Sequence, residues 1–368
     1  MTDDGTTMLS RTKTRKNPKP ILPESPMPPC KAFLSDNAIP MHPEVLEAIV
    51  RANGGDTSPY GADGTTRSAV ELFRQHFGRN TQVLLGTTGT AVNTLGLRLL
   101  THATDAIICS SAGHIDGMEG GAIEKGTGCK IVTLPSADGK ITPAQIVELV
   151  ARKTGPHGSK SKVVSLSQPT ERGTVYTVPE LRQVVDTAHR LDLLVHVDGA
   201  RLANAAASLN VPYSAITGDV GVDALSFGGT KNGAGMAEAV IIFNPSLASY
   251  AQAIQKQDGH LRSKMWVVAA QFRALLSNGL SERNAAHANR MARLLADKLA
   301  DIPEVEITQA VETNTVFARL PKGIIAAVQA RYDFYVWNGE ARCVTSYHTA
   351  ATDIDGLIHC IRTAIRAL

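Results

Sequence analysis

The sequence predicts an α/β protein in which a mainly parallel seven-stranded sheet is flanked by helices and is followed by a smaller α+β domain. Three observations support this prediction. Seven short apolar runs, mostly separated by segments of helix length, occupy the first two thirds of the chain. The pattern changes after about residue 245 to long helical stretches followed by short extended segments. The chain has 368 residues, of which 43% are hydrophobic and 19% charged, so it can bury a large core.

An amphipathic helix is predicted from Pro43, because Val45, Ala48, Ile49 and Ala52 follow helical spacing. Strands that alternate with helices pair in parallel, and ligands bind at the carboxyl ends of such strands. The seven predicted strands are Gln82–Leu85, Ala106–Cys109, Lys130–Leu134, Val163–Leu166, Leu193–Val197, Ala224–Phe227 and Ala239–Phe243.

The chain divides into three predicted parts. Residues 1–30 are basic and rich in proline, with little that could pack, so we expect a mobile tail. Residues 31–245 form the large α/β domain that binds the cofactor, and residues 246–368 form connecting helices and the small domain. The predicted elements of this last part are helices over Leu247–Ser277, Ser281–Ala300 and Thr352–Leu368, and strands over Val305–Ile307, Thr315–Ala318, Phe334–Trp337 and Ala341–Thr345.

Composition excludes several classes of protein. A formal net charge of +3 provides no basic stripe for a phosphate backbone, so we expect no nucleic-acid partner. No run of apolar residues is long enough to span a membrane, and residues 1–30 lack the apolar segment of a secretory signal, so we expect a cytoplasmic protein. The cysteines lack a Cys-x-x-Cys pair, which argues against disulfides and a metal site and favours buried thiols. They are Cys30, Cys109, Cys129, Cys343 and Cys360.

Two neighbouring segments carry the main functional signal. Lys231 lies in the glycine-rich segment Ser226–Gly233, and Asp198 ends the apolar run that starts at Leu193. A lysine in a tight, dehydrated turn can lose its proton and form a Schiff base. A buried carboxylate can keep the ring nitrogen of pyridoxal 5′-phosphate protonated. The pair therefore indicates this cofactor; the alternative is a solvated lysine and an Asp198 that pairs with Arg201 and caps the next helix.

A phosphate site is predicted where Thr88, Gly89 and Thr90 follow the first strand and open a helix. Free backbone amides at the start of a helix, with hydroxyl groups beside them, bind a phosphate dianion. The alternative is an ordinary helix cap formed by Thr88. No Gly-x-Gly-x-x-Gly loop follows the strand, which argues against a nicotinamide dehydrogenase.

Three further residues are candidates on position alone. His114 follows a strand end, where its ring could lie against a cofactor or in solvent. His157 precedes a strand, among Gly155, Pro156 and Gly158, and is expected at the surface unless its loop folds inward. Arg342 lies in a strand of the small domain, from which it could reach the boundary with the large domain and bind a carboxylate.

The motifs together resemble the low-specificity L-threonine aldolases, a family of fold-type-I pyridoxal-phosphate enzymes. The resemblance covers about residues 33 to 350. It depends on the order and number of the motifs, which are Ser35–Asn37, Tyr60–Asp63, Thr88–Asn93, His114, Thr170–Tyr176, Asp198–Arg201, Phe227–Gly233 and Ala341–Arg342.

The resemblance implies a role for each residue around the cofactor. Lys231 would form the Schiff base, Asp198 would face the pyridine nitrogen, and His114 would stack on the ring. The residues that would bind the phosphate are Thr88, Gly89, Thr90 and either Lys256 or Lys264.

The resemblance also implies the reaction, which is retro-aldol cleavage of a β-hydroxy-α-amino acid to glycine and an aldehyde by a carbon–carbon lyase. Candidate substrates are L-threonine, L-allo-threonine and phenylserine. The base that accepts the β-hydroxyl proton would be His157, His114 or an ordered water. The family further implies a homodimer or homotetramer. The positions that match the family's substrate-binding residues are Ser35, Tyr60, Arg201 and Arg342, with Tyr60 reaching in from a neighbouring subunit.

Two departures from the family lie where the substrate side chain should bind. Many members have Glu-Asn-Thr-His where this chain has Gln168–Glu171, and the segment after His114 is unusually rich in glycine. The same catalytic residues could support β-elimination, racemisation or transaldol transfer on a small amino acid. An alternative from another class is a non-catalytic binding protein built on this scaffold.

Overall fold

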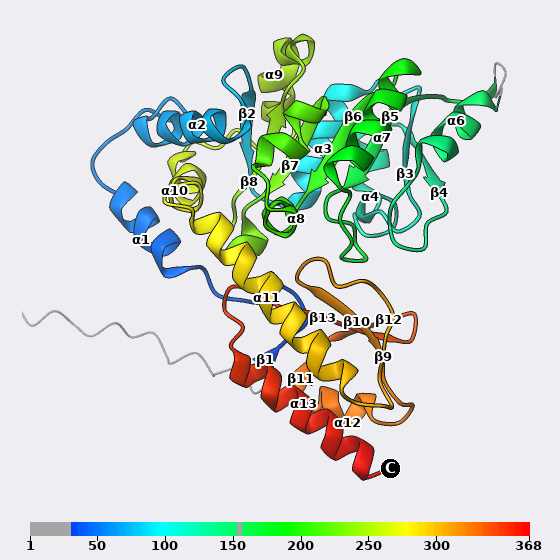
Figure 1. Ribbon diagram of the computed structural model, residues 1–368. Helices are drawn as coiled ribbons and strands as arrows, with labels where there is room; N and C mark the ends of the chain where they lie inside the picture. The colour runs from blue at the N-terminus through cyan, green and yellow to red at the C-terminus, as the bar shows by residue number, and fades with distance from the viewer. Residues whose placement is uncertain (1–30, 153–156) are drawn as a thin grey trace, which may run out of the picture.

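The structure is a computed structural model that describes residues 31–152 and 157–368 (Figure 1). The predicted tail, residues 1–30, lies outside the described residues. A large body surrounds the seven-stranded sheet and a smaller body lies below it in Figure 1. The long helix α11 (Leu280–Ala300) runs from the large body into the small one and connects the two cores.

The large sheet contains seven strands in the order β2-β8-β7-β6-β5-β3-β4. β8 is antiparallel to its neighbours β2 and β7, and the remaining neighbours are parallel. The short segment 229–237 between β7 and β8 leaves no room for a crossover helix, which explains the reversal. The predicted mainly parallel sheet is confirmed. Its strands are β2 Gln82–Gly86, β3 Asp105–Ser110, β4 Lys130–Leu134, β5 Lys160–Ser167, β6 Leu194–Gly199, β7 Ala224–Gly228 and β8 Glu238–Ile242.

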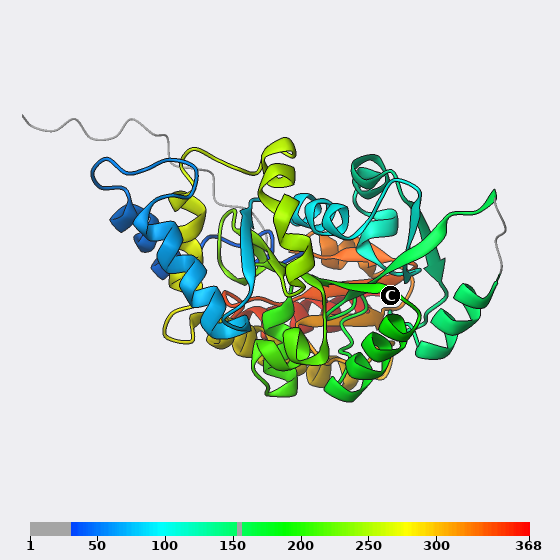
Figure 2. The ribbon, with the colours of Figure 1, turned by 90° about the horizontal axis from the view of Figure 1, so that it is seen from above.

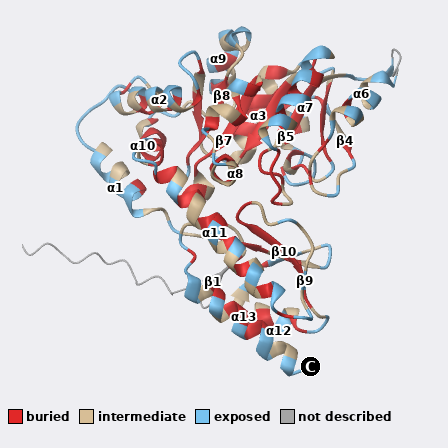
Figure 3. Cartoon of the chain, viewed as in Figure 1, coloured by how far each residue is buried: buried red, intermediate tan, exposed pale blue. Residues whose placement is uncertain are grey.

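Helices cover both faces of this sheet (Figure 2). The α-helices of the large body are α1 Pro43–Ala52, α2 Gly64–Phe77, α3 Gly89–Leu100, α4 His114–Gly117, α5 Ala122–Thr127, α6 Pro143–Ala151, α7 Val178–Arg190, α8 Leu202–Leu209, α9 Ala251–Gln257 and α10 Trp266–Leu275. Its 3₁₀ helices are η2 Tyr213–Ile216, η3 Gly218–Val220, η4 Thr230–Asn232 and η5 Pro245–Tyr250. Successive residues of β5 face opposite layers, because Val163 packs with α3 and α5 whereas Val164 packs with α7 and α8. Buried residues are accordingly concentrated in these strands and the inner faces of the helices (Figure 3).

Polar residues at the helix starts fix where the helices begin. Asp63 caps α2, since its Oδ1 accepts a hydrogen bond from the backbone N–H of Thr66 at 2.7 Å. Thr142 and Thr177 form capping boxes at the starts of α6 and α7, each followed by proline at the first or second helical position. The local sequence therefore determines the start of these helices before tertiary packing contributes.

The small body is built around a four-stranded antiparallel sheet in the order β12-β13-β10-β9, which packs against α11 and the closing helix α13. Its elements are β9 Glu306–Ile307, β10 Thr315–Arg319, α12 Ile325–Gln329, β11 Tyr332–Asp333, β12 Tyr335–Trp337, β13 Glu340–Val344 and α13 Ala351–Arg366. A separate two-stranded parallel pair joins β11 to β1 (Lys31–Ala32). Phe33, next to β1, is 1% exposed and packs in the core of the small body.

The helix predicted over Leu247–Ser277 is wrong as a single element. It is divided into η5, α9 and α10, and residues 258–265 between α9 and α10 are not helical. Gly259 has a φ of +78°, a left-handed conformation that ends α9. An isolated glycine in a helical pattern does not by itself announce such a break, which is why the sequence failed to show it.

Two general expectations concern residues in both bodies. Cys109, Cys129, Cys343 and Cys360 are buried free thiols, as predicted, and Cys30 lies outside the described residues. Within residues 31–152 and 157–368, no helix is both long enough and apolar enough to cross a bilayer.

Candidate active site

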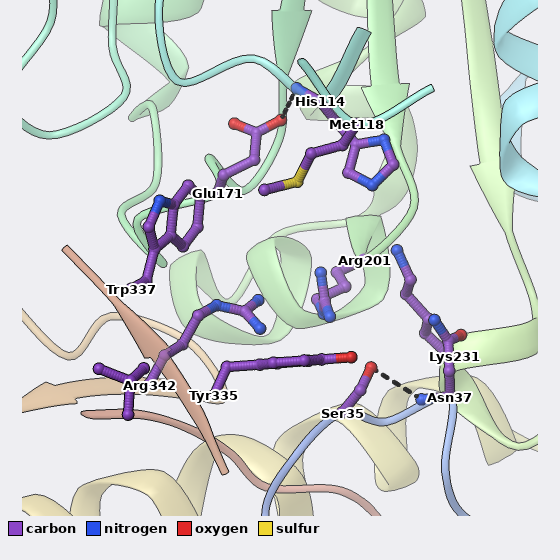
Figure 4. A pocket seen from close by; sticks show the side chains of 11 residues that line it. Ser35, Asn37, His114, Met118, Glu171, Arg201, Lys231, Tyr335, Trp337 and Arg342 are labelled. Carbon is purple, nitrogen blue, oxygen red and sulfur yellow. Dashed lines mark hydrogen bonds between the residues drawn. The ribbon is translucent and has the colours of Figure 1, made fainter. Parts of the chain in front are cut away.

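Residues from both bodies meet at the carboxyl ends of β5, β6 and β7. A cavity of about 450 Å³ opens there (Figure 4). A smaller adjoining cavity of about 50 Å³ is shared by Lys231, Asp198, His114, Gly89 and Thr90. The structure thus brings these five of the predicted cofactor residues together. The lining of the larger cavity is Ser35, Asn37, His114, Met118, Glu171, Arg201, Lys231, Tyr335, Val336, Trp337 and Arg342.

Lys231 lies in η4, directly after β7, in a turn that requires glycine. A Cβ added at Gly228 would clash with the backbone of Ala200, and one at Gly229 would lie 2.7 Å from the carbonyl oxygen of Ala237. Gly233 ends the turn with a φ of +105°, a conformation that side chains rarely adopt. Burial lowers the pKa of Lys231, and the positive charge of Arg201 lowers it further. Lys231 is therefore not a solvated turn lysine, and its amine can lose a proton.

Asp198 is the penultimate residue of β6 and is only 7% exposed. Its Oδ2 accepts a hydrogen bond from Asn93 Nδ2 at 2.9 Å, and its Oδ1 accepts one from the backbone N–H of Ala200 at 3.0 Å. Burial alone would raise the pKa of Asp198, but Lys231, His114 and these hydrogen bonds hold it below the ordinary value. Asp198 is therefore ionised in the cavity and available to a cationic group.

His114 is oriented by a buried chain of polar groups that reaches Asp198. Its Nδ1 lies 2.8 Å from Glu119 Oε1, and Asn93 Nδ2 donates both to that oxygen at 3.0 Å and to Asp198. The hydrogen bond with Glu119 raises the pKa of His114 against the opposing effect of burial. Sequence reasoning missed Glu119, and its only signal was that it is one of two acidic residues, with Asp116, in the glycine-rich segment after His114.

The start of α3 was predicted to be either a phosphate site or an ordinary helix cap, and its geometry is compatible with both. Thr88 is the N-cap, and its Oγ1 accepts from the backbone N–H of Ala91 at 3.3 Å. Gly89 and Thr90 line the same cavities as Lys231. The first amides of a helix lack partners within the helix, so this end of α3 can bind an anion as well as being capped.

The two predicted carboxylate-binding arginines differ in their surroundings. Arg201 donates from Nε and from one terminal nitrogen to the two oxygens of Asp36, both at 2.7 Å, so it does not pair with Asp198. Arg342 Nε is buried and has no hydrogen-bond partner among the described residues. Burial lowers the pKa of Arg342 to about 10, helped by the charge of Arg201, and the guanidinium still carries its proton at neutral pH. Arg342 therefore offers the less satisfied cation to an anionic ligand.

Aromatic rings hold Arg342 in place. Its guanidinium carbon lies 5.9 Å from the ring centroid of Trp337 and 6.0 Å from that of Phe317. Figure 4 shows Arg342 and Arg201 facing the centre of the cavity, with Lys231 on the far side. On the same side as Lys231, Ser35 Oγ accepts from the backbone N–H of Asn37 at 3.2 Å.

Four predicted site residues line none of the cavities around Lys231. Tyr60, Lys256 and Lys264 are exposed and lie near the α9–α10 connection, with Lys256 Nζ 4.9 Å from the ring centroid of Tyr60. His157 is exposed and precedes the amino end of β5, whereas the cavity lies beyond the carboxyl end. A strand of this length spans roughly 26 Å, so His157 cannot serve as the base in the cavity of its own chain.

Comparisons with known proteins agree with this architecture. The fold matches the solved structure of aspartate aminotransferase from Thermus thermophilus with a TM-score of 0.67 over 91% of each chain, at 15% identity. The fold is that of the fold-type-I pyridoxal-phosphate enzymes. A family model of β-eliminating lyases matches residues 32–322. The chain belongs to this family and, within it, to the low-specificity L-threonine aldolases, as the motifs predicted.

Individual relatives match over nearly their whole length. The low-specificity L-threonine aldolase of Pseudomonas sp. (strain NCIMB 10558) is 38% identical, and that of Pseudomonas aeruginosa is 39% identical. Each alignment covers 91% of this chain and 98% of the relative. The solved structure of Leishmania major threonine aldolase has a TM-score of 0.85 at 30% identity, and the match covers 92% of this chain and 99% of that one.

Proposed function

We propose that this chain uses pyridoxal 5′-phosphate to cleave a β-hydroxy-α-amino acid, such as L-threonine, L-allo-threonine or phenylserine, into glycine and an aldehyde. The observation that carries the proposal is the convergence of a buried amine, Lys231, and an ionised carboxylate, Asp198, on one cavity that also contains Arg342. The named activity of relatives that are 38% and 39% identical over most of the chain supports the same reaction.

The residues fit this cofactor. Lys231 would bind its aldehyde carbon, Asp198 would face its pyridinium nitrogen, and the start of α3 would hold its phosphate through Gly89 and Thr90. A buried carboxylate that remains ionised needs a cation, and a protonated ring nitrogen meets that requirement. When bound, pyridoxal phosphate supplies a conjugated ring that withdraws electrons from a bond at the substrate α-carbon.

The protein's own groups would orient the substrate. Arg342 would bind the carboxylate, next to Arg201, whose position is fixed by Asp36. Fixing the carboxylate sets the rotation about the bond to the α-carbon, and thereby which bond is aligned for cleavage. Glu119 would keep the ring of His114 in one orientation, so that it forms a wall of the cavity.

The direct test compares the wild type with Lys231→Ala. The wild type, incubated with threonine, phenylserine or serine, is expected to release glycine and the matching aldehyde. Release of pyruvate or of the inverted amino acid would instead identify a different reaction at the α-carbon. Lys231→Ala is expected to lose the visible absorbance of bound coenzyme and nearly all turnover. Full activity of that variant would refute the assignment of Lys231.

The proposal extends to a cytoplasmic homodimer or homotetramer. Tyr60, Lys256 and Lys264 would then belong to the site of a neighbouring subunit. Their exposure and their common location support this arrangement, and so does the fact that none of them lines the cavities around Lys231 in its own chain. Sedimentation equilibrium would measure the stoichiometry, and a monomer with full activity would contradict it.

A further inference from the structure

Glu171 carries an unexplained buried oxygen at the edge of the cavity. It follows β5, and its Oε1 accepts hydrogen bonds from Ser167 Oγ and from the backbone N–H of His114, both at 2.7 Å. Its other oxygen, Oε2, is buried and has no hydrogen-bond partner among the described residues. Buried carboxylate oxygens normally have a donor, so a missing partner next to a cavity indicates that a ligand supplies one.

The position of Glu171 limits which part of a substrate could supply that donor. Glu171 lines both adjoining cavities, and in Figure 4 it lies near Met118 and Trp337, apart from Lys231. Under the proposed function, the amino group of the substrate takes the place of the Lys231 amine and its carboxylate binds Arg342. The remaining polar group is the hydroxyl on the β-carbon, which is a hydrogen-bond donor.

We infer that Glu171 is the group that binds the β-hydroxyl of the substrate and accepts its proton; this inference depends on the proposed function. The O–H bond breaks and its proton passes to Oε2 of Glu171. The electron pair of that bond forms the carbonyl of the departing aldehyde as the Cα–Cβ bond breaks. The pair from the broken bond stays with the glycine fragment, which takes up a proton at Cα, and Glu171 returns its proton to solvent.

The electrostatics of Glu171 suit a base. Burial raises the pKa of Glu171, and the charge of Asp198 raises it further, although the hydrogen bonds from Ser167 and from the His114 backbone oppose this shift. A carboxylate with a raised pKa is a stronger base and returns its proton less readily at low pH. The other groups are less suited: His114 is bound to Glu119 and tends to keep its proton, while Arg201 and Arg342 are cations.

The test is Glu171→Gln, which keeps an oxygen for Ser167 and for the His114 backbone but removes the basic carboxylate. We expect kcat for threonine to fall at least 100-fold, because general bases contribute about 10²- to 10⁴-fold. The visible absorbance of bound coenzyme should be unchanged. Exchange of the glycine α-proton with deuterated solvent, measured by NMR, should change less than threefold, because glycine has no β-hydroxyl group.

Two further variants distinguish a base from a structural residue. Glu171→Asp retains a carboxylate and should recover at least tenfold of the activity lost in Glu171→Gln. Glu312→Gln is the matched control. Glu312 accepts a hydrogen bond at 2.5 Å from the backbone N–H of Val175, which lies in the same loop as Glu171, but Glu312 does not line the cavity. This variant should leave turnover unchanged.

The outcomes separate this inference from the proposed function. If the wild type forms no glycine and aldehyde from threonine, the proposed function itself fails. If the wild type forms both products but the kcat of Glu171→Gln lies within threefold of the wild-type value, the inference is wrong while the proposed function stands. A parallel loss of glycine exchange or of coenzyme absorbance in Glu171→Gln, or a Glu171→Asp no faster than Glu171→Gln, would also overturn it.

Discussion

Replacing Asp36 with asparagine should destabilise the protein by about 3–5 kcal/mol, the usual cost of removing one partner of a buried ion pair. Asp36 is 1% exposed and accepts four hydrogen bonds, two from Arg201 at 2.7 Å, one from Asn314 at 3.0 Å and a longer one from Ser35 Oγ at 3.4 Å. The amide keeps the shape of the side chain but offers one acceptor oxygen in place of two and no charge. Arg201 would be left as a buried cation whose charge is no longer balanced.

The effect should depend on pH in a defined direction. Burial would raise the pKa of Asp36, but the charge and hydrogen bonds of Arg201 hold it below the ordinary value of 3.8. The unfolded chain therefore binds this proton more readily than the folded protein does. The ionised Asp36 stabilises the folded protein fully above about pH 3.8, and this stabilisation is lost as the pH falls through the lower pKa that Asp36 has in the folded protein. The difference between wild type and Asp36→Asn should thus be constant near neutral pH and narrow only in strong acid.

Urea denaturation of the two proteins at pH 7 would measure this difference in the free energy of unfolding. The control is Asp192→Asn, because the Asp192 side chain is 83% exposed and its left-handed backbone suits asparagine equally well. That variant should lie within about 0.5 kcal/mol of the wild type. An Asp36→Asn protein that also lay within about 1 kcal/mol would refute the view that Asp36 is what balances Arg201.

Three further changes test other parts of the site. Arg342→Ala should bind coenzyme normally but raise KM for threonine about 10- to 150-fold. This factor corresponds to the loss of one charged hydrogen bond of about 1.5–3 kcal/mol. A coenzyme defect with unchanged KM would contradict the role of Arg342 in binding the substrate carboxylate. Glu119→Gln should lower the pKa of His114, followed by NMR of the imidazole, and an unchanged titration would show that Glu119 does not hold the proton there. Burial raises the pKa of Glu238 from 4.5 to about 7, so the folded protein holds this proton more tightly than the unfolded chain does. The protonated side chain therefore stabilises the fold fully below pH 4.5, and this stabilisation is lost as the pH rises to about 7. In the coenzyme-free protein, Glu238→Gln should remove up to about 3 kcal/mol of this pH dependence, and identical stability profiles would disprove the shift.

The strands of the large sheet could be predicted because each is a short, continuous apolar run. Such runs are typical of strands buried on both faces, and β3, β5, β6 and β7 fit this description, whereas the edge strand β4 is partly exposed. The reversal of β8 could not be read from its composition, since strand direction depends on the length of the connection. Similarly, the parallel pair of β1 with β11 joins residues about three hundred positions apart, and no local pattern encodes it.

The candidate site was predicted where residue type and local turn coincide, and missed where function depends on a distant partner. Lys231 follows β7 and Asp198 lies at the carboxyl end of β6, so the sheet geometry alone brings them to one edge. Glu119 and Asp36 became visible only when folding placed them against His114 and Arg201. His157 lies apart from the cavity of its own chain for a related reason: a residue before a strand lies at the opposite edge of the sheet from a residue after it.

The charged groups around the cavity divide into two sets with different consequences. Arg201 is bound to Asp36 and His114 to Glu119, so their interactions are satisfied within the protein and their side chains are held in place. Arg342 and Glu171 each present a buried polar atom without a partner among residues 31–152 and 157–368. A ligand gains most by satisfying such atoms, because leaving them unpaired costs about 1–3 kcal/mol each. Selectivity should therefore depend on the unpaired groups: a carboxylate at Arg342 and a hydroxyl donor at Glu171 together describe a β-hydroxy amino acid.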